Sequence, residues 1–120
     1  MIRPLRILLV EDHVDTQRVM SRLLQSFKHD VKSASSIRSA LALASAHPFD
    51  LVIADIGLPD GSGGELMSQL RKMYNLPGIA VTGFGADDFD TTWGFRARLI
   101  KPITLEQLEQ AISRSIGEPQ

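Results

Sequence analysis

Four short apolar runs in this chain each end in a charged or hydroxyl-bearing residue. Short continuous apolar runs are consistent with buried strands. When such strands run parallel in an open α/β sheet, their carboxyl ends meet at one edge, where ligands bind. We therefore interpret the end residues as parts of one site. In chain order they are Glu11 with Asp12, Asp55, Thr82 and Lys101.

The apolar runs alternate with stretches of helical period, which predicts an α/β fold with a parallel sheet. We expect five strand and helix pairs in a doubly wound sheet of order 2-1-3-4-5, with helices on both faces. In that order the ligand-binding position lies between strands one and three, which carry most of the acidic residues. The strands are expected at 7–10, 31–34, 50–54, 79–82 and 99–100.

The helices are predicted from apolar stripes and capping residues. The first is expected over roughly 13–28, with Asp12 as its N-cap. Ser62 and Thr104 each begin a capping-box pattern before a later helix, and His47 with Pro48 ends the second. The stripes, in chain order, are Val19, Met20, Leu23, Leu24 and Phe27; Ile37, Ala40, Leu41 and Ala44; Leu66, Met67, Leu70, Met73 and Tyr74; and Leu105, Leu108, Ala111, Ile112 and Ile116.

The fourth helix has the weakest signal of the five. Its stretch, 85–94, contains two threonines and several aspartates, which are poor residues for a helix interior. Only Phe89 and Trp93, spaced i and i+4, favour a helix, and we expect both to anchor the segment in the core. The aspartates are expected on a solvated face; they are Asp87, Asp88 and Asp90.

Composition narrows the class of protein. A chain of 120 residues with 43% hydrophobic and 22% charged residues fits one globular domain over 1–120, with a core of about 4–117. The net charge of −1 gives no non-specific affinity for nucleic acid or for an anionic membrane. The absence of cysteine excludes disulfides and thiol chemistry. The apolar runs are too short to span a bilayer, so we expect a cytoplasmic protein or module.

The acidic residues predict a cation site. Two carboxylates about 4 Å apart repel by roughly 1 kcal/mol in water and by about 4 kcal/mol at an effective dielectric of 20. Three together destabilise a fold unless a cation joins them. Oxygen ligands without a nearby histidine or cysteine favour Mg²⁺. The histidines are expected at the surface, away from any metal; they are His13, His29 and His47.

These residues resemble the receiver domain of two-component response regulators, over essentially the whole chain. The acidic pair, the segment 55–61, the Thr82-Gly83 strand end and the Lys101-Pro102 dipeptide occur in the family's order and near its spacing. Each motif alone is weakly specific, and their combination is highly specific. The resemblance implies a flavodoxin-like fold.

The resemblance also implies a chemical role for each site residue. Asp55 would be the phosphoacceptor, and Mg²⁺ would be held by Asp12, Asp55 and the backbone carbonyl of Gly57, with Glu11 acting through a metal-bound water. Lys101, turned toward the site by a cis peptide bond to the proline, would neutralise the phosphoryl oxygens. Thr82 would hydrogen-bond the phosphoryl group and move with it, which makes it the switch.

The partner implied is a histidine kinase or a histidine phosphotransfer domain that docks near the first helix and the site loops. No direct nucleic-acid contact and no membrane insertion are implied, and a monomer is compatible with the family. The chain is not a conventional enzyme, because its only reactions would be its own phosphorylation and dephosphorylation. No effector domain is expected in this chain. It could be a free-standing regulator or the receiver module of a hybrid histidine kinase.

Two positions depart from the family pattern. Arg98 stands where the family usually has an aromatic switch residue, so a relay from threonine to an aromatic ring is not expected. The stretch from Thr82 to Lys101 is shorter than usual, which shortens the fourth helix and puts dimerisation through that face in doubt. Gly57 and Phe84 occupy positions that tune dephosphorylation in the family.

Three other functions fit parts of the pattern. A haloacid-dehalogenase-like phosphatase also uses an aspartate nucleophile with Mg²⁺, but it needs a second aspartate where this chain has Gly57. A flavodoxin-like or dinucleotide-binding protein needs a glycine-rich loop after the first strand, where this chain has acidic residues. A degenerate receiver serving only as an interaction module is disfavoured by the complete set of five site residues.

Overall fold

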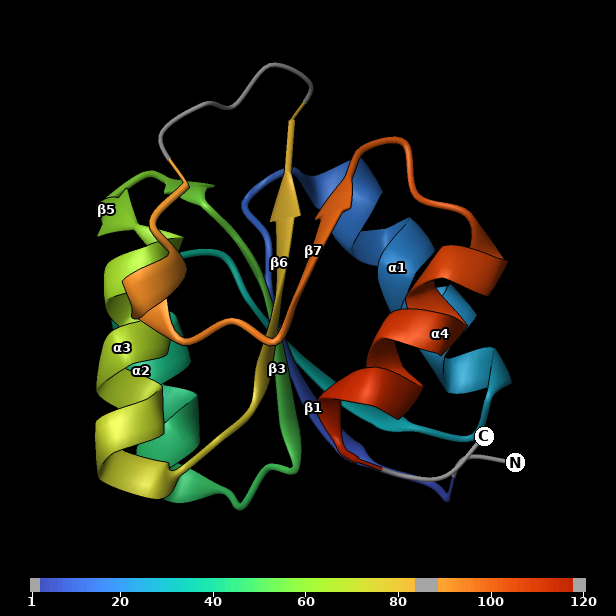
Figure 1. Ribbon diagram of the computed structural model, residues 1–120, viewed down its shortest axis with the longest axis horizontal. Helices are drawn as coiled ribbons and strands as arrows, with labels where there is room; N and C mark the ends of the chain where they lie inside the picture. Colours follow the sequence, from blue (N-terminus) through green and yellow to red (C-terminus); the bar gives the residue numbers. More distant parts are fainter. Residues whose placement is uncertain (1–2, 84–88, 118–120) are drawn as a thin grey trace.

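The computed structural model of the protein describes residues 3–83 and 89–117, and its centre is a five-stranded parallel sheet (Figure 1). The strand order is β2-β1-β3-β6-β7. Because β6 and β7 are the fourth and fifth strands of this sheet along the chain, the order is 2-1-3-4-5, as predicted. The strands are β1 (Arg6–Val10), β2 (Asp30–Ala34), β3 (Leu51–Asp55), β6 (Gly78–Thr82) and β7 (Ala97–Ile100).

Two helices cover each face of this sheet, with α1 and α4 on one face and α2 and α3 on the other (Figure 1). None of the described helices combines the length and the apolar character needed to cross a membrane. The helices are α1 (Val14–Ser26), α2 (Ile37–Ala46), α3 (Gly63–Tyr74) and α4 (Leu105–Ser115).

The alternation of side chains along each strand explains why the central strands contain continuous apolar runs. In β1, Ile7 and Leu9 join the core under α1 and α4, while Leu8 and Val10 join the core under α2 and α3. Successive side chains point to opposite faces, and both faces are covered, so positions 7–10 of the strand are all buried. The first residue beyond the strand is then free to be polar at the sheet edge.

A short hairpin connects β3 to α3. It consists of β4 (Gly57–Leu58) and β5 (Gly61–Ser62), which pair antiparallel. The helix then begins directly against the end of β3, because a Cβ atom on Gly63 would lie 1.9 Å from the backbone oxygen of Asp55. Asp60 in the hairpin accepts the backbone N–H groups of Ile37 and Arg38, which ties the hairpin to the start of α2.

Helix capping differs from the prediction in two places. The N-cap of α1 is His13 rather than Asp12, and its side chain makes no capping bond. At α3 the capping box is half formed in the described structure, since Ser62 accepts the Gly64 N–H without a reciprocal bond. The box that Thr104 forms with Gln107 at α4 is complete, as predicted.

The predicted apolar stripes are wider than the faces that the sheet covers. Val19 in α1 is 58% exposed, and Met73, Tyr74 and Leu105 are also exposed. The sheet reaches only the central residues of each stripe, so the residues at its margins stay in contact with water. Members of the stripes that are fully buried include Met20, Leu24, Leu66, Met67, Leu70, Leu108 and Ile112.

His29 is another correction, because it is buried and not at the surface. It is 5% exposed, and its Nδ1 accepts the backbone N–H of Leu5 at 3.0 Å. Burial lowers the pKa of His29, since the charged imidazolium is poorly solvated there. The neutral ring therefore serves as a structural acceptor beside the start of β1. The prediction of surface positions is correct for His13 and His47, which are exposed.

The connection between β6 and β7 contains less helix than expected. Its described residues form one short 3-10 helix, η1 (Thr91–Trp93). Phe89 packs edge-on against Trp93 (ring centroids 5.5 Å apart), and both rings are half-buried, so they anchor the segment without being part of the closed core. Asp90 is exposed, as predicted, and caps η1. Phe84, Asp87 and Asp88 lie outside the described residues.

Candidate functional site

The five residues singled out from the sequence lie at the carboxyl edge of the sheet, at or just beyond the ends of four strands. The end residues of β3 and β6 belong to the strands themselves, and the others follow β1 and β7 directly. Because β1 and β3 are neighbours at the centre of the sheet, their end residues are brought together without any long loop. The residues are Glu11 and Asp12 after β1, Asp55 in β3, Thr82 in β6 and Lys101 after β7.

Lys101 connects two of the carboxylates. Its Nζ donates to Glu11 Oε1 at 2.7 Å and to Asp55 Oδ2 at 3.0 Å. Its backbone N–H donates to the carbonyl of Thr82, and its peptide bond to Pro102 is cis, as the resemblance implied. The ammonium group is thus held inside the site.

Asp55 is almost completely enclosed, with 8% of its surface exposed. Burial raises its pKa, and the negative charge of Glu11 adds to this effect, while the hydrogen bond from Lys101 opposes it. The other carboxylate oxygen, Oδ1, accepts the backbone N–H of Gly57 at 3.2 Å. Both oxygens therefore have a donor, and these donors fix the orientation of the carboxylate.

Glu11 and Lys101 remain charged beside it. Burial would raise the pKa of Glu11, but hydrogen bonds from Lys101 and His13 outweigh burial and lower it. Burial would lower the pKa of Lys101, but its bonds to the two carboxylates outweigh burial and raise it. The site is therefore ionic, with more negative than positive charge.

Two oxygen atoms at this edge are buried without a hydrogen-bond partner in the described structure. They are Asp12 Oδ1 and the hydroxyl oxygen of Thr82, a residue that is only 2% exposed. An unsatisfied buried polar atom costs about 1–3 kcal/mol. Such atoms are expected where a ligand completes the site.

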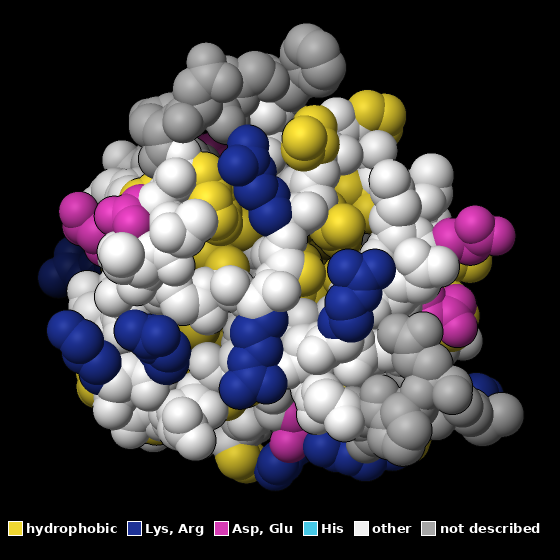
Figure 2. Space-filling view, in the orientation of Figure 1, with side chains coloured by type: hydrophobic (Ala, Val, Ile, Leu, Met, Phe, Trp, Pro, Cys, Tyr) yellow, Lys and Arg dark blue, Asp and Glu magenta, His cyan; other side chains and the backbone are white. Residues whose placement is uncertain are grey.

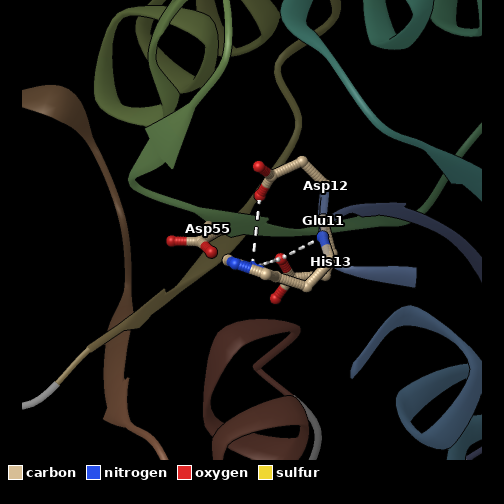
Figure 3. Close-up of side chains that lie close together, drawn as sticks. All are labelled: Glu11, Asp12, His13 and Asp55. Carbon is tan, nitrogen blue, oxygen red and sulfur yellow. Dashed lines mark hydrogen bonds and ion pairs between the residues drawn. The ribbon is translucent and has the colours of Figure 1, made fainter. Parts of the chain in front are cut away.

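The donor set suits a divalent cation. Ligand atoms of Glu11, Asp12, His13 and Asp55 all lie within 4.8 Å of one another, and Figure 3 shows these four side chains converging. Three carboxylates and one ammonium leave a formal charge of −2, which one divalent ion neutralises. The unpartnered oxygen of Asp12 and the oxygen-rich set fit Mg²⁺.

His13 is the member of this cluster that the sequence did not reveal. Metal-ligand spacing to another histidine is absent from the sequence, so spacing alone gave no reason to place it near a metal. Its direct succession to the acidic pair, just before a helix, was the available signal. The expectation that no histidine lies near the cation site was therefore wrong.

A groove of about 510 Å³ adjoins the site between α1 and α4. Its lining is mainly apolar and includes the exposed side chain of Val19 together with Pro102 and Ile103. Lys101 lines the same groove, so the groove reaches a residue of the site.

The edge strand β7 is open toward solvent beside η1. Its alternate residues Arg98 and Ile100 are exposed, and the guanidinium of Arg98 lies 4.7 Å from the centre of the Phe89 ring. Figure 2 shows Lys and Arg side chains spread over this face with hydrophobic side chains between them. An arginine stacked on an aromatic ring thus occupies the position where the resemblance would place an aromatic residue.

Comparison with known proteins gives consistent matches. A family model described as the response regulator receiver domain matches residues 7–113. The response regulator protein PilR of Pseudomonas aeruginosa is 29% identical over 114 residues, which are 91% of this chain and 25% of PilR. The virulence sensor protein BvgS of Bordetella pertussis is 33% identical over 124 residues, covering 94% of this chain and 10% of BvgS. The chain thus spans a quarter or less of these two relatives.

A solved structure shows the same fold. The response regulator receiver domain protein (CheY-like) from Methanospirillum hungatei superimposes with a TM-score of 0.88 at 27% sequence identity. The match covers 96% of this chain and 95% of that one. The similarity therefore extends over nearly the whole of both chains.

Proposed function

This chain belongs to the response regulator receiver domain family, and from that membership we propose that it accepts a phosphoryl group on Asp55 in two-component phosphorelay signalling. The observation that carries the proposal is the position of Asp55, a buried carboxylate held by Lys101 and the Gly57 N–H in an otherwise acidic site. Asp55 ends a buried strand, and both of its carboxylate oxygens are bonded to groups at the sheet edge.

The reaction would transfer phosphorus from nitrogen to oxygen. A carboxylate oxygen of Asp55 attacks the phosphorus of a phosphohistidine on the partner, the P–O bond forms and the P–N bond breaks. The departing imidazole takes a proton from solvent, and Asp55 carries the phosphoryl group as an acyl phosphate. Lys101 supplies a fixed positive charge for the phosphoryl oxygens, which is the main catalytic requirement of phosphoryl transfer. Slow hydrolysis would return the carboxylate.

Mg²⁺ is the cofactor we assign to this site. Asp12, Asp55 and the backbone carbonyl of Gly57 would hold it, with Glu11 acting through a water molecule. When bound, the ion supplies neutralisation of the phosphoryl charge that Lys101 alone does not complete. The unpartnered Oδ1 of Asp12 and the formal charge of −2 support this assignment.

Thr82 and Lys101 would form the switch. The Thr82 hydroxyl is buried and without a hydrogen-bond partner among the described residues, so a phosphoryl oxygen would give it one. The Lys101 N–H already bonds the Thr82 carbonyl, which couples the ends of β6 and β7. Arg98, in β7, stacks on Phe89. Movement of Thr82 would therefore change this arginine–ring contact, and it would not be passed to an aromatic side chain of β7.

The partner would be a histidine kinase or a histidine phosphotransfer domain docked on the groove between α1 and α4. The apolar lining of the groove and its opening at Lys101 support this position, because the incoming phosphohistidine must reach Asp55. We propose a single receiver domain over residues 1–120, acting in the cytoplasm without direct contact to nucleic acid. The chain could act as a free-standing regulator or as the receiver of a hybrid kinase, and it could be monomeric.

Phosphorylation by a small donor tests the proposal. The protein is incubated with acetyl phosphate and Mg²⁺, and the intact mass is measured before and after acid or base treatment. We expect a gain of one phosphoryl group that is lost on treatment, absent with EDTA and absent in Asp55→Asn. The matched control Asp30→Asn changes an exposed aspartate at the opposite end of the sheet and should label normally. A folded wild-type protein that does not label would overturn the proposal and favour an interaction module.

A further inference from the structure

His13 lies at the cation site, although no step of the proposed phosphotransfer uses it. Its Nδ1 is 3.3 Å from Glu11 Oε2 and 3.5 Å from Asp12 Oδ1 (Figure 3). The backbone N–H of His13 also donates to Glu11 Oε2 at 3.1 Å, and the residue is the N-cap of α1. The start of the helix thus holds an exposed imidazole next to the acidic pair.

The distances from His13 fit the edges of a metal coordination sphere. Zinc bound tetrahedrally at about 2.0–2.2 Å by nitrogen and oxygen ligands has neighbouring ligands about 3.3–3.6 Å apart. Octahedral Mg²⁺ at about 2.0–2.1 Å has neighbouring ligands only about 2.9 Å apart. Both distances from His13 Nδ1 fall in the first range. In the ion-free structure the shorter one is a hydrogen bond to Glu11 Oε2, which an ion bound by both groups would replace.

The oxygens needed for such an ion are not the ones that Lys101 uses. Lys101 binds Glu11 Oε1 and Asp55 Oδ2, while the oxygens near His13 are Glu11 Oε2 and Asp12 Oδ1. Asp12 Oδ1 is buried and makes no hydrogen bond in the described structure. His13 Nδ1 thus lies near one oxygen of each residue of the acidic pair, and Lys101 is bonded to neither of these two oxygens.

We propose that His13 supplies a nitrogen ligand that makes this site bind Zn²⁺ more tightly than Mg²⁺, with Glu11 and Asp12 as the other ligands. Imidazole is a good ligand for zinc, whereas Mg²⁺ prefers oxygen ligands and retains its waters. The ring would bind through Nδ1. This inference deepens the proposed function, because it assumes the same cation position beside Asp55. A transition ion would then compete with Mg²⁺ for the phosphorylation site.

Imidazole NMR on the untagged, ¹⁵N-labelled protein tests the ligand directly. The three histidines give three pairs of ring-nitrogen signals, so His29 and His47 serve as internal controls. Titration with Zn²⁺ should shift the Nδ1 signal of His13 first, at stoichiometric metal. Titration with Mg²⁺ should leave its chemical shift close to that of the free protein. A Zn²⁺ titration that leaves the His13 nitrogen unchanged would overturn the inference.

Affinities measured by calorimetry complete the test. His13→Ala should weaken Zn²⁺ binding at least about 10-fold while the Mg²⁺ affinity stays the same. His47→Ala, which removes another exposed histidine, should change neither affinity. Equal losses for both ions in His13→Ala would contradict a nitrogen ligand and indicate a structural role. Far-ultraviolet circular dichroism confirms that each variant is folded.

The two proposals fail in different ways. Wild-type protein that takes up phosphate at Asp55 with Mg²⁺ but binds Zn²⁺ equally well without His13 overturns only the inference. Protein that binds Zn²⁺ through His13 but cannot be phosphorylated with Mg²⁺ supports the inference and overturns the phosphoacceptor function.

Discussion

The carboxyl ends of β1 and β3 and the connection between β6 and β7 border the same edge of the sheet, but different forces hold them. The strand ends follow buried apolar runs, and Glu11 and Asp55 there are joined by hydrogen bonds to Lys101. In its described part, the connection is held by partly exposed rings and by Arg98 stacked on Phe89. The residues proposed for the chemistry are therefore held by buried backbone, whereas the described part of the connection is held by partly exposed contacts that can change at lower cost.

The largest loss of stability is expected from a substitution where α3 begins against the end of β3. Gly63→Ala places a Cβ 1.9 Å from the Asp55 backbone oxygen, and backbone on a buried strand cannot move aside. We expect a loss of roughly 3 kcal/mol in the free energy of unfolding, at the upper end for overpacking. Urea denaturation measures it. Gly57→Ala is the control, because a Cβ there meets nothing within 4 Å, and its stability should change by about 0.5 kcal/mol at most.

The second-largest loss of stability is expected where α3 contacts the connection between β6 and β7. A Cβ on Gly64 would lie 1.9 Å from the Trp93 ring, which belongs to η1 and is half-buried. Gly64→Ala should therefore displace the ring and cost about 1–2 kcal/mol, less than Gly63→Ala. Trp93 fluorescence should shift to longer wavelength while phosphorylation at Asp55 persists. If Gly64→Ala were the more destabilising of the two, the contrast between the regions would be wrong.

At Asp55, a substitution is expected to increase the stability of the fold by a smaller amount. Burial raises its pKa above the unfolded value, so the folded state binds a proton more readily and loses stability as the pH rises toward the folded pKa. Asp55→Asn removes this cost and should be more stable than wild type by about 1 kcal/mol above that pH. The advantage should shrink as the pH falls to the unfolded pKa. Urea midpoints at several pH values measure it, and a constant or reversed difference would contradict the assigned repulsion.

The smallest effect is expected at Arg98. Arg98→Ala removes the contact with the Phe89 ring, which is worth about 0.5–1 kcal/mol at an exposed site. Phosphorylation should be unchanged, because the contact lies outside the catalytic groups, but the fluorescence response of Trp93 to phosphorylation should decrease. A large loss of labelling would show that the connection also positions the strand ends.

The central strands and their end residues could be predicted because each is encoded locally. Continuous apolar residues identify strands covered on both faces, and the first polar residue after each run then falls at the sheet edge. The positions of Asp55 and Lys101 in one cluster follow from that rule, although they are 46 residues apart. Their roles in phosphoryl transfer were inferred by resemblance and remain predictions.

The features that the sequence did not reveal depend on contacts between distant segments. His29 is buried and accepts the N–H of Leu5, which lies 24 residues away in the sequence. Val19 is exposed because α1 and α4 leave a groove between them, which the stripe of one helix cannot show. His13 is the N-cap of α1 and contacts both carboxylates of the acidic pair, which the expected cap at Asp12 did not indicate. Local periodicity contains no information about these distances.

The most direct test of the phosphoacceptor site is to locate the phosphoryl group on the chain. Protein treated with acetyl phosphate and Mg²⁺ is reduced with borohydride, which converts an acyl phosphate to an alcohol, and the peptides are sequenced by mass spectrometry. The account predicts that residue 55 alone is converted to homoserine. Conversion at another aspartate, with residue 55 intact, would contradict it.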